Sequence, residues 1–121
     1  MSLPVWIAVG LLGGIGALGR FFVDGIVAAR TRYDFPLGTL VVNLTGATVL
    51  GFLVGLGLTG TRLLLAGTAT LGSYTTFSTW MLETQRLVED GELALAGANV
   101  VISLVVGVGA AALGRLIGGH V

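Results

Sequence analysis

The 121-residue sequence contains no cysteine and only one histidine, His120, next to the C-terminus. Without cysteine, neither a disulfide nor a thiolate metal site can form. We interpret the single terminal histidine as solvated, which leaves no basis for a histidine metal site or a histidine-containing catalytic triad. Since no other set of nucleophile, base and orienting residue stands out, we do not expect an enzyme.

Charged residues are scarce as well. They make up 10% of the chain, whereas hydrophobic residues make up 55%, and the mean hydropathy is +1.00. A soluble domain with a polar surface does not reach these values. We therefore predict an integral membrane protein, in contact with a lipid bilayer and without a nucleic-acid partner.

Four long gaps separate the charged residues. A bilayer core about 30 Å thick takes roughly 20 apolar residues per helix, and each gap is long enough to supply them. The first gap lacks the basic start of a signal peptide and is interpreted as a retained helix. Short links make successive helices antiparallel, which predicts one up-down-up-down transmembrane domain over residues 1–121. The predicted spans are residues 3–29, 35–58, 63–85 and 93–116.

Basic residues are almost balanced between the two ends of this predicted bundle. Arg62 and Arg115 belong to the side with both termini, and Arg30, Arg32 and Arg86 to the other. The positive-inside rule orients a chain by this count, and two against three is a weak bias. Two interpretations remain open: insertion in both orientations, which would permit an antiparallel dimer, or one orientation with the first link in the cytoplasm.

Glycine is abundant, with 21 residues, and most of the glycines lie inside the predicted helices. Lipid gives helices no hydrophobic reason to associate, so close contact through small faces has to supply the attraction. The pattern predicts tight packing within or between subunits. The glycines at helical spacing are Gly10, Gly13, Gly16 and Gly19, then Gly51 and Gly55, and finally Gly114 and Gly118.

Polar side chains inside a span are costly without partners, so they are the first candidates for a pathway. In the second span, Thr39 and Asn43 lie one turn apart on one face. The Asn43 amide has two N–H groups that can bind an anion, but an interhelical hydrogen bond explains it equally well. In the fourth span, Asn99 and Ser103 are also one turn apart and form a second polar stripe facing the third span.

The third span contains Gly72 followed by seven residues of which five are serine or threonine. This composition predicts a break in the helix, which frees backbone carbonyls for cations and amides for anions. The alternative is a bent helix whose hydroxyls bond back to its own carbonyls. Phe77 and Trp80 share a face just beyond the break, either as ring edges directed at an anion or as ordinary packing.

Arg20 follows a wholly apolar stretch of the first span. Its side chain either extends to the membrane interface or lines an aqueous vestibule that concentrates anions. The sequence leaves both interpretations open.

Three segments together resemble the Fluc/CrcB family of dual-topology fluoride ion channels: GGIGALGR at 13–20, GTLVVNLTG at 38–46 and GSYTTFST at 72–79. Their order and spacing and the length of the chain also match that family. The resemblance implies an antiparallel dimer in the cell inner (plasma) membrane with two pores, formed with a second copy or a paired homologous chain. It implies passive exit of fluoride, which lowers fluoride toxicity, with rejection of chloride.

The resemblance also implies roles for individual residues. The backbone carbonyls of Gly72 and Thr75 would bind a structural Na⁺ at the dimer centre, and Arg20 would line the vestibule. Two positions depart from the family pattern, because Trp80 replaces a usual phenylalanine and Asn99 a frequent tyrosine. The implied fluoride pore comprises Asn43, Phe77, Ser78, Thr79, Trp80, Asn99 and Ser103.

Two other functions were weighed on the sequence. A proton-coupled small multidrug transporter needs a carboxylate in the first half of the bundle, whereas the only acid in the first span, Asp24, is near its end. A non-transporting accessory membrane protein would need neither the polar break nor Asn43.

Overall fold

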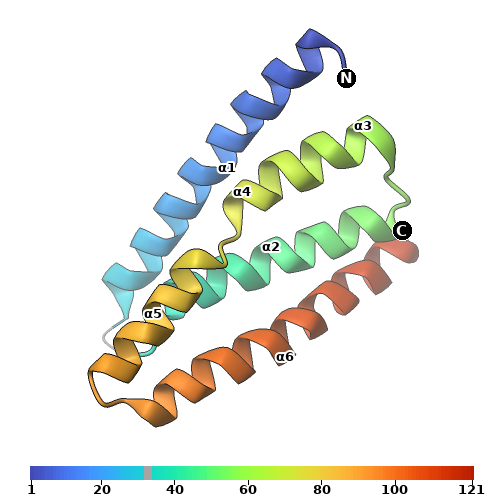
Figure 1. Cartoon of the computed structure of the whole chain (residues 1–121). Coiled ribbons are helices and arrows are strands. Elements are labelled where there is room, and N and C mark those ends of the chain that lie inside the picture. The colour runs from blue at the N-terminus through green and yellow to red at the C-terminus, as the bar shows by residue number, and fades with distance from the viewer. Residues whose placement is uncertain (32–33) are drawn as a thin grey trace.

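The computed structural model describes residues 1–31 and 34–121, and every regular element in this part is a helix (Figure 1). The predicted all-α fold is thereby confirmed. Arg32, which was counted on the first link, lies outside the described residues. The elements are α1 (Leu3–Arg30), α2 (Leu37–Gly55), α3 (Gly60–Leu63), the π-helix η1 (Leu64–Leu71), α4 (Gly72–Tyr74), α5 (Ser78–Glu89) and α6 (Leu93–Gly119).

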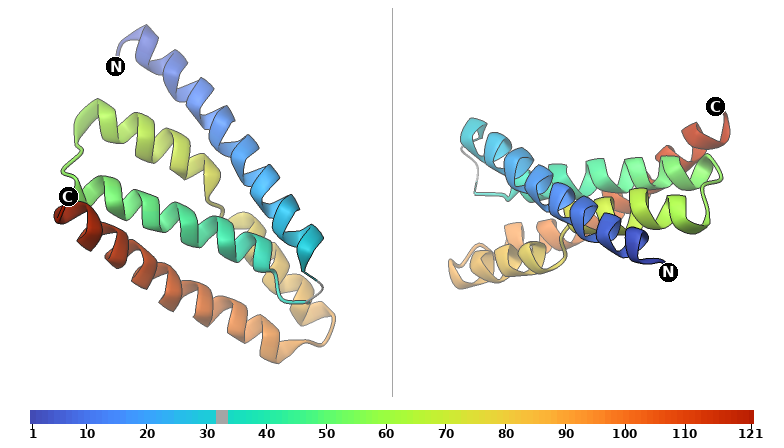
Figure 2. Two further views of the ribbon diagram at one scale, coloured as in Figure 1. Left: turned by 180° about the vertical axis from the view of Figure 1, so that it is seen from behind. Right: turned by 90° about the horizontal axis from the view of Figure 1, so that it is seen from above.

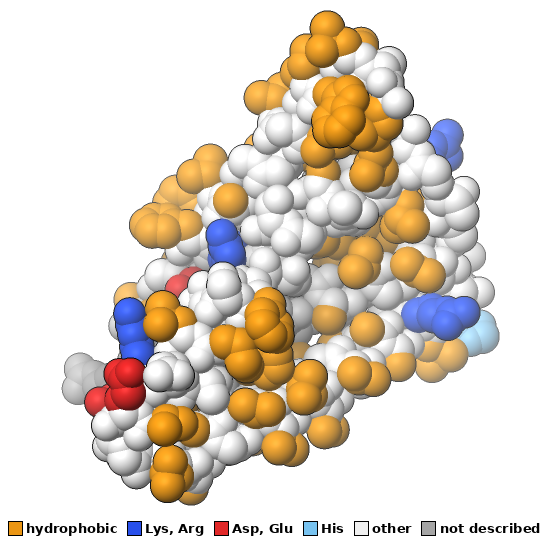
Figure 3. Space-filling model, in the orientation of Figure 1, with side chains coloured by type: hydrophobic (Ala, Val, Ile, Leu, Met, Phe, Trp, Pro, Cys, Tyr) orange, Lys and Arg blue, Asp and Glu red, His pale blue; other side chains and the backbone are white. Residues whose placement is uncertain are grey.

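Three helices, α1, α2 and α6, are long and apolar enough to cross a membrane. At 1.5 Å per residue, the 28 residues of α1 rise about 42 Å. Large hydrophobic side chains on α1 and α6 are exposed, among them Trp6, Phe22 and Val105. Figure 3 shows such side chains over much of the surface, with charged groups mostly toward the ends. This is the surface of a multi-pass membrane protein.

The remaining crossing of the bundle is divided into pieces. After α4 the backbone becomes extended at Thr75 (φ −77°, ψ 161°), and α5 begins three residues later at Ser78. Figure 1 shows α4 and α5 as separate helices joined by this short segment. The predicted break in the third span is confirmed, and it lies at residues 75–77.

Both termini and the α2–α3 link lie at one end of the bundle, while the α1–α2 and α5–α6 links lie at the other (Figure 1). Gly91 makes the α5–α6 link with a φ of 79°, which favours a residue without Cβ. The arrangement of ends agrees with the alternating course predicted from the short links.

The most extensive helix pair is α2 with α6, and glycines make it possible. An added Cβ at Gly51 would meet the carbonyl oxygen of Ala111, and one at Gly114 would meet that of Thr48. Backbones that approach this closely gain van der Waals contact along the whole pair. Gly55 and Gly118 make equivalent close approaches, so the predicted glycine faces of the second and fourth spans are confirmed.

The helix α1 crosses the bundle obliquely and contacts η1, α2 and α4 (Figure 2). A Cβ at Gly16 would meet the carbonyl oxygen of Thr70, and one at Gly13 would lie 3.3 Å from Ser73 Oγ. Gly10 differs from them, since a Cβ there would meet nothing within 4 Å. The glycine face of α1 therefore packs against the segment just before the break.

Candidate functional site

Asn43 on α2 is bonded to the break itself. Its Nδ2 donates a hydrogen bond to the Thr76 carbonyl oxygen at 2.9 Å, and the Thr76 backbone N–H donates to Asn43 Oδ1 at 2.8 Å. This pair uses the amide oxygen and one of the two amide N–H groups. The interhelical bond considered from the sequence is therefore present, and the second N–H of Asn43 is not part of it.

The last carbonyls before the break, Ser73 O among them, lack the donors that a continuous helix would give them, and for Gly72 O and Thr75 O the diverted donors can be traced. In a helix the Thr76 N–H would bond to Gly72 O, but here it donates to Asn43 Oδ1. Likewise the Thr79 N–H would bond to Thr75 O, but it donates to Thr76 Oγ1 at 3.2 Å. The displaced acceptors, Gly72 O and Thr75 O, are the two carbonyls that the family resemblance indicated as cation ligands.

Carbonyl oxygens suit a hard cation such as Na⁺, so the donor set at Gly72 and Thr75 fits the implied ion. No cluster of three or more acidic, histidine or cysteine residues that could hold a metal occurs in residues 1–31 and 34–121. A cation at the break would therefore depend on the backbone.

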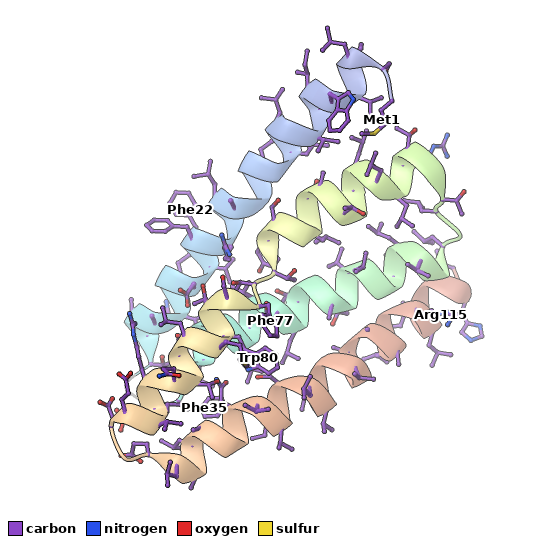
Figure 4. The ribbon with its side chains drawn as sticks, in the orientation of Figure 1. Met1, Phe22, Phe35, Phe77, Trp80 and Arg115 are labelled. Carbon is purple, nitrogen blue, oxygen red and sulfur yellow. The ribbon has the colours of Figure 1, made fainter. Side chains whose placement is uncertain are left out.

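An open groove of about 560 Å³ runs beside the break, lined by residues of α2, η1, α4, α5 and α6. Phe77 and Trp80 line it with their ring centroids 5.6 Å apart and their planes at 81°, an edge-to-face arrangement (Figure 4). The Phe77 ring is 69% exposed. Six of the residues singled out from the sequence line this groove: Asn43, Gly72, Thr75, Phe77, Trp80 and Ser103.

Asn99 lies behind the Trp80 ring and is 1% exposed. Its backbone carbonyl accepts a hydrogen bond from the Trp80 indole N–H at 3.1 Å. Its side-chain Nδ2 donates to Thr84 Oγ1 at 2.8 Å, and its Oδ1 accepts from Ser103 Oγ at 3.5 Å. Asn99 thus contacts the proposed pathway through Trp80 and Ser103.

A second cavity, of about 330 Å³, lies on the α1 side of the break. It contains the half-buried Arg20 together with Thr79 and Asp24, so a region with charged side chains lies on the side of the break opposite the largely apolar groove. Ser78, the first residue of α5, is exposed.

The sequence did not indicate the partner of Thr39. Its hydroxyl donates a hydrogen bond to Glu83 Oε1 on α5, and Thr39 is 2% exposed. Thr39 and Asn43 both point from α2 toward the third span, as their spacing predicted. The sequence shows Glu83 near the end of the third span, which marks it as a possible hydrogen-bond acceptor. Only the packing of α5 on α2 brings it to Thr39.

Comparison with known proteins places these residues in a family. The family model for CrcB-like protein, Camphor Resistance (CrcB), matches residues 7–115. A protein of Mycolicibacterium paratuberculosis named fluoride-specific ion channel FluC 2 is 59% identical over 114 residues, which is 94% of this chain and 93% of that protein. Its namesake in Mycobacterium tuberculosis is 56% identical over 117 residues, 97% of this chain and 93% of that protein.

A more distant relative also aligns over almost the whole chain. The fluoride-specific ion channel FluC of Opitutus terrae is 42% identical over 125 aligned positions, covering 96% of this chain and 92% of that protein. The family model and the relatives cover all of the residues described above, from Arg20 to Ser103. The chain belongs to the CrcB family.

Proposed function

We propose that this chain is a fluoride-selective channel that lets fluoride leave the cell passively and works as an antiparallel dimer. The observation that carries the proposal is the groove beside the break, where Asn43, Phe77 and Trp80 meet on an open face. The names of its relatives support fluoride as the ion.

The open groove supports a dimer. A path for a bare ion through a membrane must be enclosed, and one 12.3 kDa bundle leaves this groove, with Asn43 and Ser103 on its wall, open on one side. A second copy, or a paired homologous chain, would close it. The near balance of basic residues at the two ends supports a partner inserted in the opposite direction.

Fluoride is small and strongly hydrated, so a narrow path must return hydrogen bonds to it. The second N–H of Asn43 and the hydroxyls of Ser78 and Thr79 supply donors. Ser103, whose O–H bonds to Asn99 Oδ1, lines the groove. The electropositive edges of Phe77 and Trp80 supply further favourable contacts where no hydroxyl is available. Chloride is larger and would be rejected where the closed path narrows beside the rings.

Arg20 is proposed to act outside the narrow part of the path. Its guanidinium shares a cavity with Thr39 and Thr79, where it would raise the local concentration of anions. HF enters cells as a neutral acid and dissociates inside. The membrane potential then favours exit of the anion through an open pore.

We propose a structural Na⁺ at the centre of the dimer, bound by the backbone carbonyls of Gly72 and Thr75. The displacement of their helical donors by Asn43 and Thr76 supports this assignment. Two carbonyls from each of two copies would give four ligands. Bound there, the cation would neutralise the carbonyl dipoles that otherwise face one another across the interface.

The test is fluoride efflux from liposomes that contain the purified chain, measured with a fluoride electrode beside chloride-loaded liposomes. We expect fast fluoride efflux without chloride efflux. The Phe77→Ile variant removes the exposed ring and keeps an apolar side chain of similar width, so it should lose most of the flux. A matched control, Phe22→Ile, removes a ring from the exposed surface of α1 and should keep the flux.

Absence of fluoride efflux from a folded dimer of the unmodified chain would overturn the proposal for two identical copies. Equal efflux of chloride would refute selectivity. Undiminished fluoride flux in Phe77→Ile would remove the ring from the pathway.

A further inference from the structure

The two rings beside the groove are anchored differently. Trp80 takes part in a closed circuit of three hydrogen bonds with Asn99 and Thr84. Its indole N–H donates to Asn99 O at 3.1 Å, Asn99 Nδ2 donates to Thr84 Oγ1 at 2.8 Å, and Thr84 Oγ1 donates to Trp80 O at 2.9 Å. Phe77, in contrast, has no polar atom on its ring and is 69% exposed.

Each member of the circuit depends on another. A buried indole N–H needs an acceptor, and a phenylalanine at position 80 would need none. The Asn99 amide is 1% exposed, so its polar atoms also need partners inside the protein. Thr84 and Ser103 provide them, at 2.8 Å and 3.5 Å. The tryptophan and the asparagine are therefore physically coupled.

The circuit also joins two helices. Trp80 and Thr84 lie one turn apart on α5, and Asn99 lies on α6. The short α5 is separated from the rest of its span by the break, so it relies on α6 for its position. Two hydrogen bonds between the helices at the level of Trp80 fix both the ring and the backbone that carries it.

We propose that Asn99 and Thr84 are positioning residues that hold the Trp80 ring at a fixed distance from the path, whereas the Phe77 ring has no hydrogen-bonded anchor. This inference rests on the proposed function for its effect on ion flow. Asn99 then acts on the anion through Trp80 and does not line the pore. A ring edge that is already oriented loses less entropy when the ion arrives.

The first measurement concerns the ring itself. The chain has two tryptophans, so a Trp6→Phe chain labelled with 5-fluorotryptophan carries its fluorine only at Trp80. Its ¹⁹F NMR spectrum is recorded in fluoride-free buffer. Thr84→Val removes the hydroxyl and keeps the shape of the side chain, so the resonance should shift and broaden. Thr84→Ser restores the hydroxyl and should return the resonance to its original position.

The control is Thr48→Val, the same substitution at a hydroxyl that bonds only to the Leu44 carbonyl on its own helix, at 2.8 Å. It should leave the Trp80 resonance unchanged. If Thr84→Val also leaves it unchanged, or if Thr84→Ser fails to restore it, the circuit does not position the ring.

The second measurement concerns flow. Thr84→Val should lower fluoride efflux by roughly three- to tenfold, the factor that corresponds to one hydrogen bond of ordinary strength. In a Trp80→Phe chain the hydrogen bond from the indole N–H to Asn99 O is already absent. Adding Thr84→Val should therefore lower efflux no further. An equal loss in both backgrounds would show that Thr84 acts independently of the ring and would overturn the proposal.

The two measurements separate this inference from the proposed function. If the unmodified chain conducts no fluoride, the proposed function fails, while the ¹⁹F spectra still decide whether Asn99 and Thr84 hold the ring.

Discussion

The side-chain amide of Asn43 pairs with both backbone polar groups of Thr76, at 2.9 Å and 2.8 Å. An amide side chain has the same donor and acceptor as a peptide group, so Asn43 replaces backbone partners inside the membrane. Because the Thr76 N–H donates to Asn43, it is not available to Gly72 O, its acceptor in a continuous helix. Asn43 therefore stabilises the break and diverts the N–H that would otherwise bond to Gly72 O.

Asn43→Leu should therefore destabilise the protein. The substitution keeps the size of the side chain and leaves two backbone groups of Thr76 without their partner. We expect the free energy of unfolding to fall by about 2–6 kcal/mol, at roughly 1–3 kcal/mol for each of the two unsatisfied groups. Denaturant unfolding in detergent, followed by circular dichroism, measures the change. An unchanged stability would mean that the Thr76 groups find other partners.

Thr76→Val should weaken the response to sodium. Thr76 Oγ1 accepts the Thr79 N–H, and without it that N–H is free to bond to Thr75 O and restore the helical ladder. The carbonyl would then be a poorer cation ligand. We expect the unmodified protein to unfold at a higher temperature in sodium buffer than in N-methylglucamine buffer, and this difference to shrink in Thr76→Val.

Thr76→Ser is the matched control for that comparison, because it keeps the hydroxyl and should keep the sodium effect. Equal sodium stabilisation in Thr76→Val and Thr76→Ser would argue against Thr75 O as a ligand. Stability that is insensitive to sodium in the unmodified chain would argue against the ion itself.

Gly114→Ala should disrupt the α2–α6 pair. Its Cβ would meet the carbonyl oxygen and backbone of Thr48, which cannot move aside without separating the two helices. We expect a loss of about 1–3 kcal/mol in the free energy of unfolding, the usual cost of overpacking. Gly109→Ala on the same helix meets nothing within 4 Å and should be neutral or slightly stabilising.

Insertion in both orientations can be measured at a single added thiol. The chain has no cysteine, so His120→Cys gives one labelling site at the end that carries both termini. A membrane-impermeant maleimide applied to intact cells should label about half of the protein if the two orientations are equally populated. Labelling close to none or to all of it would indicate one orientation.

Added basic residues provide the control for this topology experiment. Thr59 and Thr61 are exposed on or beside α3, at the same end as Arg62 and Arg115. Changing both to lysine raises the count at that end from two to four, against the three arginines at the other. The excess of one basic residue then moves to the end with the termini, so the labelled fraction should fall as more chains keep both termini in the cytoplasm.

The amino-acid sequence alone determined the class of the protein and the place of its break. Scarce charge and long apolar gaps require a membrane, and a run of hydroxyl residues after Gly72 makes a continuous helix unfavourable there. These properties are local, since each depends on neighbours within a few turns. The glycine spacings on α2 and α6 were equally informative, because close helix packing requires small residues at a regular interval.

Only the tertiary structure decided which polar groups use one another and which remain for an ion. The pairing of Asn43 with Thr76, of Thr39 with Glu83 and of Trp80 with Asn99 joins residues between 19 and 44 positions apart. No local pattern specifies such partners, because they depend on the rotation and depth at which the helices pack. The family resemblance implied a pore role for Asn99, and only helix packing reveals that its amide bonds to Thr84 and its carbonyl to the Trp80 indole.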